Sequence, residues 1–303
     1  MEYLRVPLRS VNSQEVSAQW GSTAARNAEL AEGEAPADEL WVRLREEAQD
    51  AFRRAPMLAP LFVDSILAQP SFEAAIVHRI AVRLASSSVG IDLLVRTFHR
   101  AFESEPAIGR ALRADIAAVL ERDPACERLI EPFLYFKGFH AVQTHRLAHW
   151  LWHHAERDFA LYLQSRSSDV FQTDIHPAAS FGKGIFLDHA TGLVVGGTAV
   201  IEDDVSLLQD VTLGGTGKEA RDRHPKVRRG AMIGAGAKIL GNIEIGSFAR
   251  IAAGALVLAS VPPNATVAGI PAKIVKASEK TAQAQGLDQI LKRLSYEYSE
   301  FSI

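Results

Sequence analysis

The sequence predicts an all-helical amino-terminal domain followed by a left-handed parallel β-helix of hexapeptide repeats, and two observations carry this prediction. Between residues 175 and 211, and again between 227 and 257, bulky apolar residues recur at every sixth position, with Ala199 as the one small exception. A period of six fits neither a helix nor an amphipathic strand, but it is typical of a β-helix whose sixth side chains point into a three-sided core. The residues from 38 to 168 instead show the 3.6-residue spacing of amphipathic helices.

The helical part is expected to contain at least four amphipathic helices. Asp38 and Ser71 stand where two of them should begin, because their side chains can accept hydrogen bonds from the first-turn amides. Apolar residues spaced by four over 108–120 predict a third helix, which Asp123-Pro124 should end. A fourth segment follows Gly138. We therefore expect a helical domain over residues 37–170.

The remaining boundaries follow from changes in this pattern. Residues 1–36 contain few bulky side chains, so we expect a mobile extension. The period changes to six near residue 171, and consecutive prolines after Val261 should stop the strands, which predicts a β-helix over 171–275. The polar segment 276–303 is expected to be a flexible tail.

Composition excludes several classes of protein. The net charge of −3 and the pI near 6.4 do not favour nucleic acid or an anionic membrane as a partner. No apolar run approaches the ~18 residues that a membrane span needs. A single cysteine, Cys126, leaves no internal disulfide and suits a reducing compartment. We expect a soluble, cytoplasmic protein.

The period is interrupted once, between Val211 and Val227, which lie sixteen positions apart. Because sixteen is not a multiple of six, we expect the chain to leave the coil there in a loop over 214–226. This loop combines glycines with a dense polar and basic run, which favours a functional role. The spacing of a phosphate-binding P-loop is absent.

A second unusual string places Asp188 and His189 directly after the inward Leu187. In a three-sided coil, positions about eighteen apart stack on one another, so Asp174 is expected to reach His189. A carboxylate on one ring nitrogen would leave the other as a general base of fixed tautomer. The pattern therefore indicates machinery that deprotonates a hydroxyl, rather than a metal site.

Several strings in the chain resemble those of serine acetyltransferases over roughly residues 38–275. They are RDPAC (122–126), FKGFH (136–140), DIHP (174–177), LDHATG (187–192), GGTGK (214–218) and DRHPK (222–226). The resemblance implies transfer of an acetyl group from acetyl-CoA to the hydroxyl of L-serine in cysteine biosynthesis, giving O-acetyl-L-serine and CoA. Because Cys126 lies far from His189 in sequence, we expect the serine hydroxyl to attack directly, without an acyl-enzyme.

The resemblance also implies roles for individual residues. His189 would be the catalytic base and Asp174 its partner. Serine, or cysteine as an inhibitor in the same site, would be held by Asp123 from the helical domain, Asp188, Arg223 and His224. Acetyl-CoA would lie in a cleft between neighbouring β-helices, beside Gly215, Ala235, Ala253 and, as a weaker candidate, Arg250. It would be a co-substrate, with no permanently bound cofactor and no metal.

The same resemblance implies partners. Members of the family form homotrimers through the β-helix, and two trimers commonly join through their helical domains. The carboxy-terminal isoleucine inserts into the active site of O-acetylserine sulfhydrylase (cysteine synthase). Ile303 matches that residue, although Phe301-Ser302 departs from the acidic-glycine ending of the family.

Three alternatives remain open at this point. Another hexapeptide acyltransferase would share His189 but would need neither Asp123 nor the loop at 223–224. A zinc enzyme on the same fold would use three histidines, here His176, His189 and His224. An inactive scaffold would only bind the sulfhydrylase through its tail. The three histidines spaced by four at 145, 149 and 153 are explained by helix packing.

Overall fold

The computed structural model describes residues 38–217 and 221–276. The chain divides into two compact units, Met1–Val42 and Arg43–Ile303, and the helices after residue 42 and the β-helix both belong to the second unit. The predicted extension 1–36 and nearly all of the predicted tail 276–303 lie outside the described residues. Within the described ranges, no helix is both long and apolar enough to span a membrane.

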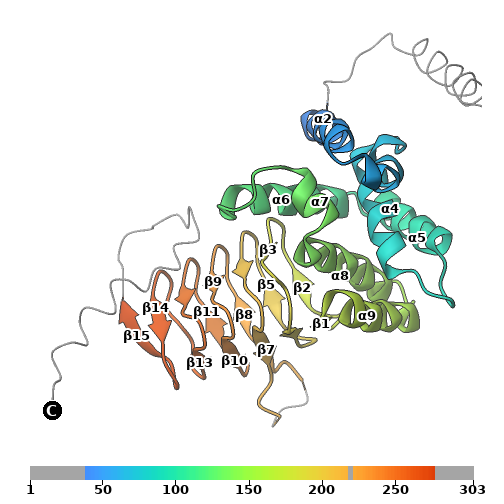
Figure 1. Cartoon of the computed structure of the whole chain (residues 1–303). Coiled ribbons are helices and arrows are strands. Elements are labelled where there is room, and N and C mark those ends of the chain that lie inside the picture. Colours follow the sequence, from blue (N-terminus) through green and yellow to red (C-terminus); the bar gives the residue numbers. More distant parts are fainter. Residues whose placement is uncertain (1–37, 218–220, 277–303) are drawn as a thin grey trace, which may run out of the picture. The chain divides into compact units, whose positions relative to one another are not determined.

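The first part of the described chain is helical, as the 3.6-residue spacing predicts (Figure 1). The Ser71 side chain accepts a hydrogen bond from the amide of Ala74, which confirms the predicted start of that helix. Asp123 follows the last residue of the predicted third helix. The elements are α2 (Glu39–Arg54), the 3₁₀ turn η1 (Pro56–Leu58), α3 (Ala59–Phe62), the π-helical turn η2 (Val63–Leu67), α4 (Phe72–Leu84), α5 (Ile91–Ser104), α6 (Ala107–Arg122), α7 (Ile130–Leu134), α8 (Lys137–His153) and α9 (Arg157–Phe171).

A parallel β-helix follows, so the predicted fold class is confirmed. Its strands form three sheets, one for each face of the coil. Sheet A contains β1 (Thr173–Ile175), β4 (Leu193–Val195), β7 (Thr212–Gly214), β10 (Lys238–Leu240) and β13 (Leu256–Val257). Sheet B contains β2 (Ser180–Phe181), β5 (Val200–Ile201), β8 (Lys226–Val227) and β11 (Glu244–Ile245). Sheet C contains β3 (Phe186–Leu187), β6 (Ser206–Leu207), β9 (Met232–Ile233), β12 (Arg250–Ile251), β14 (Thr266–Ala268) and the antiparallel β15 (Lys273–Lys276).

The strand register shows that each hexapeptide of the coil buries two sets of side chains, of which the six-residue count followed one and then the other. Ile175 pairs with Val195, and Leu187 with Leu207. Each hexapeptide also buries the residue four places after its strand residue, as Ala231 after Val227 shows. Up to Leu187 the count of six follows the strand residues, and after Leu187 it follows the residues four places later, which are also buried. The apolar pattern in the sequence therefore shows no break at this point. The predicted Leu193, Ala199, Val205 and Val211 are all buried, as expected. The strand ladder, however, continues from Ile175, Phe181 and Leu187 through Val195, Ile201, Leu207 and Leu213.

Two insertions interrupt the regular coil, and only one of them was predicted. Regular coils take eighteen residues, as between Ile233 and Ile251. The first coil, from Ile175 to Val195, takes twenty, and its two extra residues fall in the turn after Leu187 that contains Asp188 and His189. The second coil, from Ile201 to Val227, takes 26 and includes the predicted loop. Both insertions thus carry predicted site residues.

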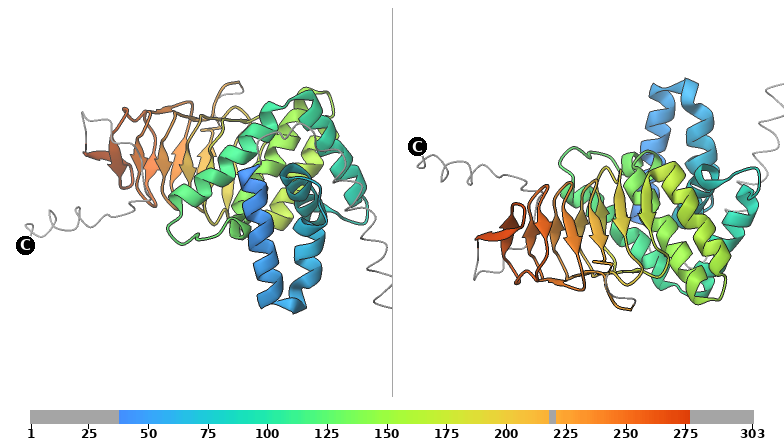
Figure 2. Two further views of the ribbon diagram at one scale, coloured as in Figure 1. Left: turned by 90° about the horizontal axis from the view of Figure 1, so that it is seen from above. Right: turned by 90° about the horizontal axis from the view of Figure 1, so that it is seen from below.

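The helices cover the end of the β-helix where its first strands lie (Figure 2). The contact centres on a buried ion pair between α8 and α6, in which Arg146 Nε and Nη2 donate to Asp115 Oδ2 at 2.9 and 2.8 Å. Asp115 also accepts the amide of Ile185, and Arg146 donates to the carbonyl of Gly182. Burial raises the pKa of Asp115, while Arg146 opposes that shift. One pair therefore joins two helices to the first coil.

Other side chains satisfy further backbone groups at this edge, which would otherwise lack a neighbouring strand. His145 Nε2 and His149 Nδ1 donate to the carbonyls of Ala179 and Pro177, at 3.1 and 2.8 Å. On α6, Arg122 donates to the carbonyl of Gly184. The helical segment thus takes the place of a preceding coil.

We expect Arg146→Met to lower the free energy of unfolding by about 3–5 kcal/mol, because it leaves the carboxylate of Asp115 buried without its partner. Urea unfolding would measure this. Replacing both residues, as Asp115→Leu with Arg146→Met, should cost less than Arg146→Met alone. As a control, Arg53→Met removes an exposed ion pair with Asp50 and should cost no more than about 1 kcal/mol. Equal losses for the two single variants would contradict the central role of this pair.

Candidate functional site

Three of the predicted site residues gather where α6 meets the end of β3. Asp123 directly follows α6, and Asp188 and His189 directly follow β3. His189 Nε2 lies 3.5 Å from Asp188 Oδ2. The side chain of His189 is 70% exposed, whereas that of Asp188 is 19% exposed. A substrate can therefore reach the imidazole, while the carboxylate beside it is largely shielded from water.

The two carboxylates of this group lie close enough to influence each other. Burial raises the pKa of Asp188, and the negative charge of Asp123 adds to that rise, whereas His189 opposes it. Two carboxylates that repel each other in a half-buried position favour a cation between them. The arrangement fits a ligand with a positively charged amino group.

Asp174 does not contact His189 in this structure, contrary to the expected pairing. Its Oδ1 accepts a hydrogen bond of 2.6 Å from Gln164 Nε2 on α9. The expectation assumed eighteen residues per coil, but the two extra residues put Asp174 beside Val194 in the ladder. His189 lies in the inserted turn beyond the strand edge, so it does not stack on Asp174.

The second group of predicted residues surrounds the loop that precedes β8. Thr198 Oγ1 accepts the amides of Arg223 and His224 at 3.1 and 3.2 Å. The carbonyl of Thr198 accepts Lys226 Nζ at 2.7 Å. Thr198 thus fixes the end of the loop that holds Arg223 and His224. The described part of this loop omits residues 218–220.

The contacts of His224 determine which ring nitrogen carries its proton. Nδ1 receives both the amide of Thr198, at 3.2 Å, and its hydroxyl, at 2.8 Å. An amide N–H can only donate, so Nδ1 is an acceptor and carries no proton. Burial lowers the pKa of His224, and the charges of Arg223 and Lys226 lower it further. We therefore assign a neutral imidazole with the proton on Nε2, which makes Nε2 a hydrogen-bond donor.

Two glycines make room for these rings. A Cβ on Gly196 would lie 2.0 Å from His224 Nε2, and one on Gly197 would lie 2.9 Å from His176 Nδ1. His176 Nδ1 accepts the amide of Ala178, so its Nε2 is also a donor. His176 and His224 thus lie beside one another over this glycine pair.

The two groups lie at different corners of the coil. Asp188 and His189 occupy the corner between sheets C and A, whereas Arg223 and His224 occupy the corner between sheets A and B. Sheet A separates these corners, so the folded chain does not bring all the predicted serine-binding residues into one cluster.

The predicted CoA-binding residues are divided in the same way. Ala235 and Ala253 stack at the corner between sheets C and A, where the amide of Gly254 donates to the carbonyl of Ala235. They continue the column of turns that His189 begins. Arg250 lies on the adjacent β12, and Gly215 packs against Arg223, whose Cγ and Cδ would lie 3.2 Å from an added Cβ.

Cys126 and the histidines do not form an alternative site. Cys126 is 8% exposed, and burial raises the pKa of its thiol to about 11, so the reactive thiolate is disfavoured. Over residues 38–217 and 221–276, no three His, Cys, Asp or Glu side chains are arranged to hold a metal ion. The histidines of the zinc alternative therefore do not converge within the described chain.

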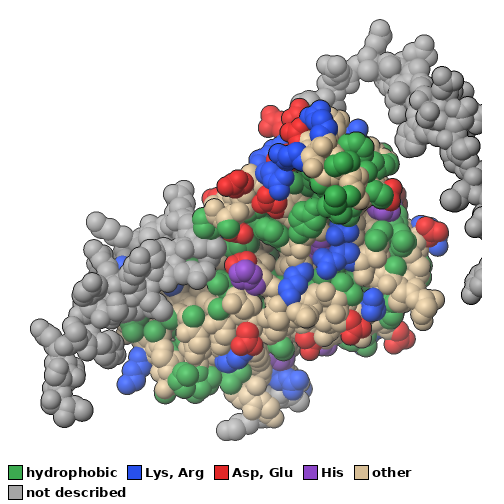
Figure 3. Space-filling model, viewed as in Figure 1, with side chains coloured by type: hydrophobic (Ala, Val, Ile, Leu, Met, Phe, Trp, Pro, Cys, Tyr) green, Lys and Arg blue, Asp and Glu red, His purple; other side chains and the backbone are tan. Residues whose placement is uncertain are grey.

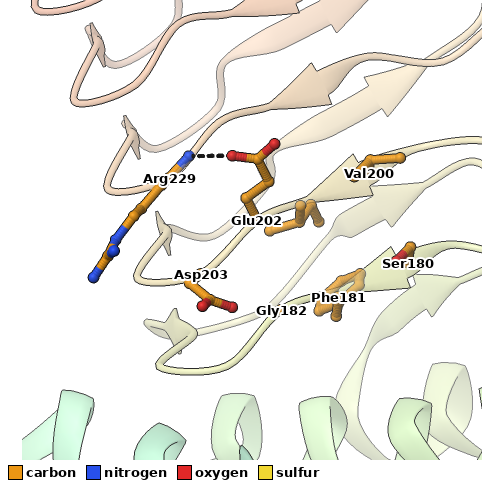
Figure 4. A pocket seen from close by; sticks show the side chains of 8 residues that line it. Ser180, Phe181, Gly182, Val200, Glu202, Asp203 and Arg229 are labelled. Carbon is orange, nitrogen blue, oxygen red and sulfur yellow. Dashed lines mark hydrogen bonds between the residues drawn. The ribbon is translucent and has the colours of Figure 1, made fainter.

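The predicted residues differ in exposure, because His189 is exposed whereas His224 is buried. On the face viewed in Figure 3, histidine and acidic side chains lie together where the helices meet the β-helix. A hollow of about 330 Å³ lies elsewhere, on sheet B, and contains none of the predicted residues (Figure 4). Its Glu202 already accepts the amide of Arg229. That hollow is not the candidate site.

Several residues with a role in this geometry were missed in the sequence analysis. They are Thr198, Gly196, Gly197, Gln164 and Lys137. The tandem glycines one coil before the loop were a usable signal, because paired glycines in a strand turn indicate a close approach. Gln164 and Lys137 act across the helix–coil junction, which a repeat pattern does not reveal.

Comparisons with known proteins agree with the resemblance in the sequence. Residues 40–144 match the family model described as "Serine acetyltransferase, N-terminal". The serine acetyltransferase of Haemophilus influenzae is 49% identical over 251 residues, covering 83% of this chain and 94% of that protein. A crystal structure of the Brucella abortus serine acetyltransferase with coenzyme A has a TM-score of 0.79 and 58% identity, covering 81% of this chain and 98% of that one.

A further solved structure, of a serine acetyltransferase in complex with cysteine, has a TM-score of 0.77 and 51% identity, covering 78% of this chain and 99% of that chain. Identity at this level extends through both the helices and the β-helix. The chain therefore belongs to the serine acetyltransferase family.

Proposed function

We propose that the chain transfers an acetyl group from acetyl-CoA to the hydroxyl of L-serine, giving O-acetyl-L-serine and CoA for cysteine biosynthesis. The observation that carries this proposal is the exposed imidazole of His189 beside the carboxylates of Asp188 and Asp123. Solved structures of serine acetyltransferases include one in complex with coenzyme A and one in complex with cysteine. Cysteine differs from serine only by a sulfur atom in place of the hydroxyl oxygen. The family and the site thus support one reaction.

In the proposed mechanism, His189 removes the proton from the serine hydroxyl as the oxygen attacks the thioester carbonyl. The bond from carbon to sulfur then breaks, and the protonated His189 gives its proton to the thiolate of CoA, which restores the neutral imidazole. The high pKa of Cys126 argues against an acyl-enzyme, so we propose direct transfer. Asp174 stays the proposed partner of His189, since Gln164 occupies only its Oδ1 and a carboxylate has a second acceptor oxygen.

The two groups of residues match the two charges of an amino acid. Asp123 and Asp188 would hold the ammonium, while Arg223 and the Nε2 hydrogen of His224 would hold the carboxylate. Because the groups occupy different corners of the β-helix, in different coils, we propose that a neighbouring subunit of a homotrimer completes the site. Acetyl-CoA would lie along the column of small residues at Ala235 and Ala253, with contacts from Gly215 and Arg250.

Replacing His189 tests the mechanism. We expect His189→Ala to lower kcat about a hundredfold or more, since general-base catalysis contributes roughly 10²–10⁴-fold. Release of CoA from acetyl-CoA and L-serine would be measured by a thiol assay. His99→Ala, in an exposed position on α5, serves as the control and should keep the wild-type rate. Wild-type turnover by His189→Ala would refute the proposed base.

Thr198 offers a test of serine binding. Thr198→Val keeps the shape of the side chain but removes the hydroxyl that orients His224, so we expect the KM for serine to rise about tenfold, the equivalent of one or two hydrogen bonds. Thr198→Ser should stay near wild type. Thr266→Val on the distant β14 is the matched control. If Thr198→Val leaves the serine KM unchanged, His224 does not hold the substrate as proposed.

We also propose that the carboxy terminus binds O-acetylserine sulfhydrylase, as the family resemblance implies for Ile303, which lies outside the described residues. Deleting Ile303 should weaken binding to the sulfhydrylase, measured by titration calorimetry, without changing acetyl transfer. The mass of the assembly, measured by light scattering, should remain that of a trimer or a dimer of trimers. An unchanged affinity for the sulfhydrylase after the deletion would refute the proposal.

A further inference from the structure

The turn that carries His189 has an unusual backbone. His189 and Ala190 have φ values of 55° and 61°, in the left-handed region. The amide of Ala190 donates to the carbonyl of Asp188 at 2.6 Å, and the amide of Thr191 donates to that of His189 at 2.7 Å. A left-handed conformation costs a non-glycine residue about 1–2 kcal/mol. Such a turn persists only where its surroundings hold it in place.

Three side chains hold this turn against the helical part of the chain. Lys137 Nζ donates to Gln172 Oε1 at 2.8 Å and also to Thr191 Oγ1. The hydroxyl of Thr191 lies 3.2 Å from Gln172 Oε1 and 3.4 Å from the carbonyl oxygen of His189. The carbonyl of Gln172 accepts the amide of Gly192 at 2.9 Å. Lys137, Gln172 and Thr191 therefore form a triangle, which we call the turn clamp.

Lys137 is itself held in a fixed place. It is the first residue of α8, and the next residue, Gly138, lies so close to β3 that an added Cβ would be 1.9 Å from the carbonyl oxygen of Leu187. Leu187 directly precedes Asp188, so the lysine backbone is fixed against the start of the turn. Both acceptors of its ammonium are neutral oxygens, and the ion pairs of the described residues do not include it. Its charge thus serves to strengthen hydrogen bonds to the turn.

We propose that Lys137 is a positioning residue for acetyl transfer, because the turn clamp fixes the backbone that aims the His189 imidazole. The inference rests on the proposed role of His189 as the base. Loosening the clamp would let the turn relax toward ordinary backbone angles and would move the imidazole away from the serine hydroxyl. A displacement of about 1 Å can cost up to a hundredfold in rate.

Two variants of the turn clamp test this inference. Thr191→Val keeps the branched shape but removes the hydroxyl, and Lys137→Met keeps most of the length but removes the ammonium. We expect kcat to fall about tenfold or more in each, with KM values for serine and acetyl-CoA within about twofold of wild type. Thr191→Ser should restore the rate. Lys183→Met, at an exposed turn between β2 and β3, is the matched control and should keep wild-type kinetics.

The same lysine variant in a second background separates positioning from a general structural role. If Lys137 acts through His189, then Lys137→Met should lower the residual rate of His189→Ala by much less than tenfold. An equal fold-loss in both backgrounds, or wild-type kcat in a folded Thr191→Val, would overturn the inference. Should Lys137→Met fail to fold in thermal melts, Thr191→Val alone decides. A fully active His189→Ala would instead refute the proposed base itself.

Discussion

The buried pair of Asp115 and Arg146 is the interaction on which the arrangement of the site depends. Burying two charges costs free energy unless each finds its partners, and here the carboxylate also accepts the amide of Ile185 while the guanidinium reaches the carbonyl of Gly182. The pair therefore fixes α6 and α8 against the first coil. Asp123 at the end of α6 and Lys137 at the start of α8 reach the His189 turn from these two helices.

Much of the fold could be predicted from the sequence because hexapeptide periodicity is a direct consequence of a three-sided coil. The change of period near residue 171 agrees with the end of α9 at Phe171 and the start of β1 at Thr173. The inward positions predicted for the second coil are buried, but they do not follow the strand register, and the reason is physical. Each hexapeptide buries two side chains, so a two-residue insertion after Leu187 shifts the count from one buried set to the other. The larger insertion before Val227 interrupts the apolar pattern itself, so it was visible in the sequence.

The candidate site was predictable in its residue types but not in its contacts. His189 and Asp188 are adjacent in sequence, and the structure places their side chains side by side. The pairing of Asp174 with His189 depended on the coil length, and the extra two residues left Asp174 with Gln164. The tautomer of His224 depends on Thr198, which lies 26 positions earlier and meets it only because the loop returns to the coil. Contacts of this kind depend on the tertiary fold, so no local sequence pattern predicts them.

Both departures from the regular coil occur where chemistry is proposed, and the structure indicates why. A regular hexapeptide turn serves packing, and its outward residues are held at fixed positions by the strands on either side. An inserted turn is free of that spacing and can project an exposed imidazole, but it then loses the strand ladder that would hold it. At His189 the helical segment supplies the missing support through the turn clamp, and at His224 Thr198 supplies it. The helices therefore contribute more than a cover for the first coil, because Lys137 at the start of α8 holds the turn that carries His189.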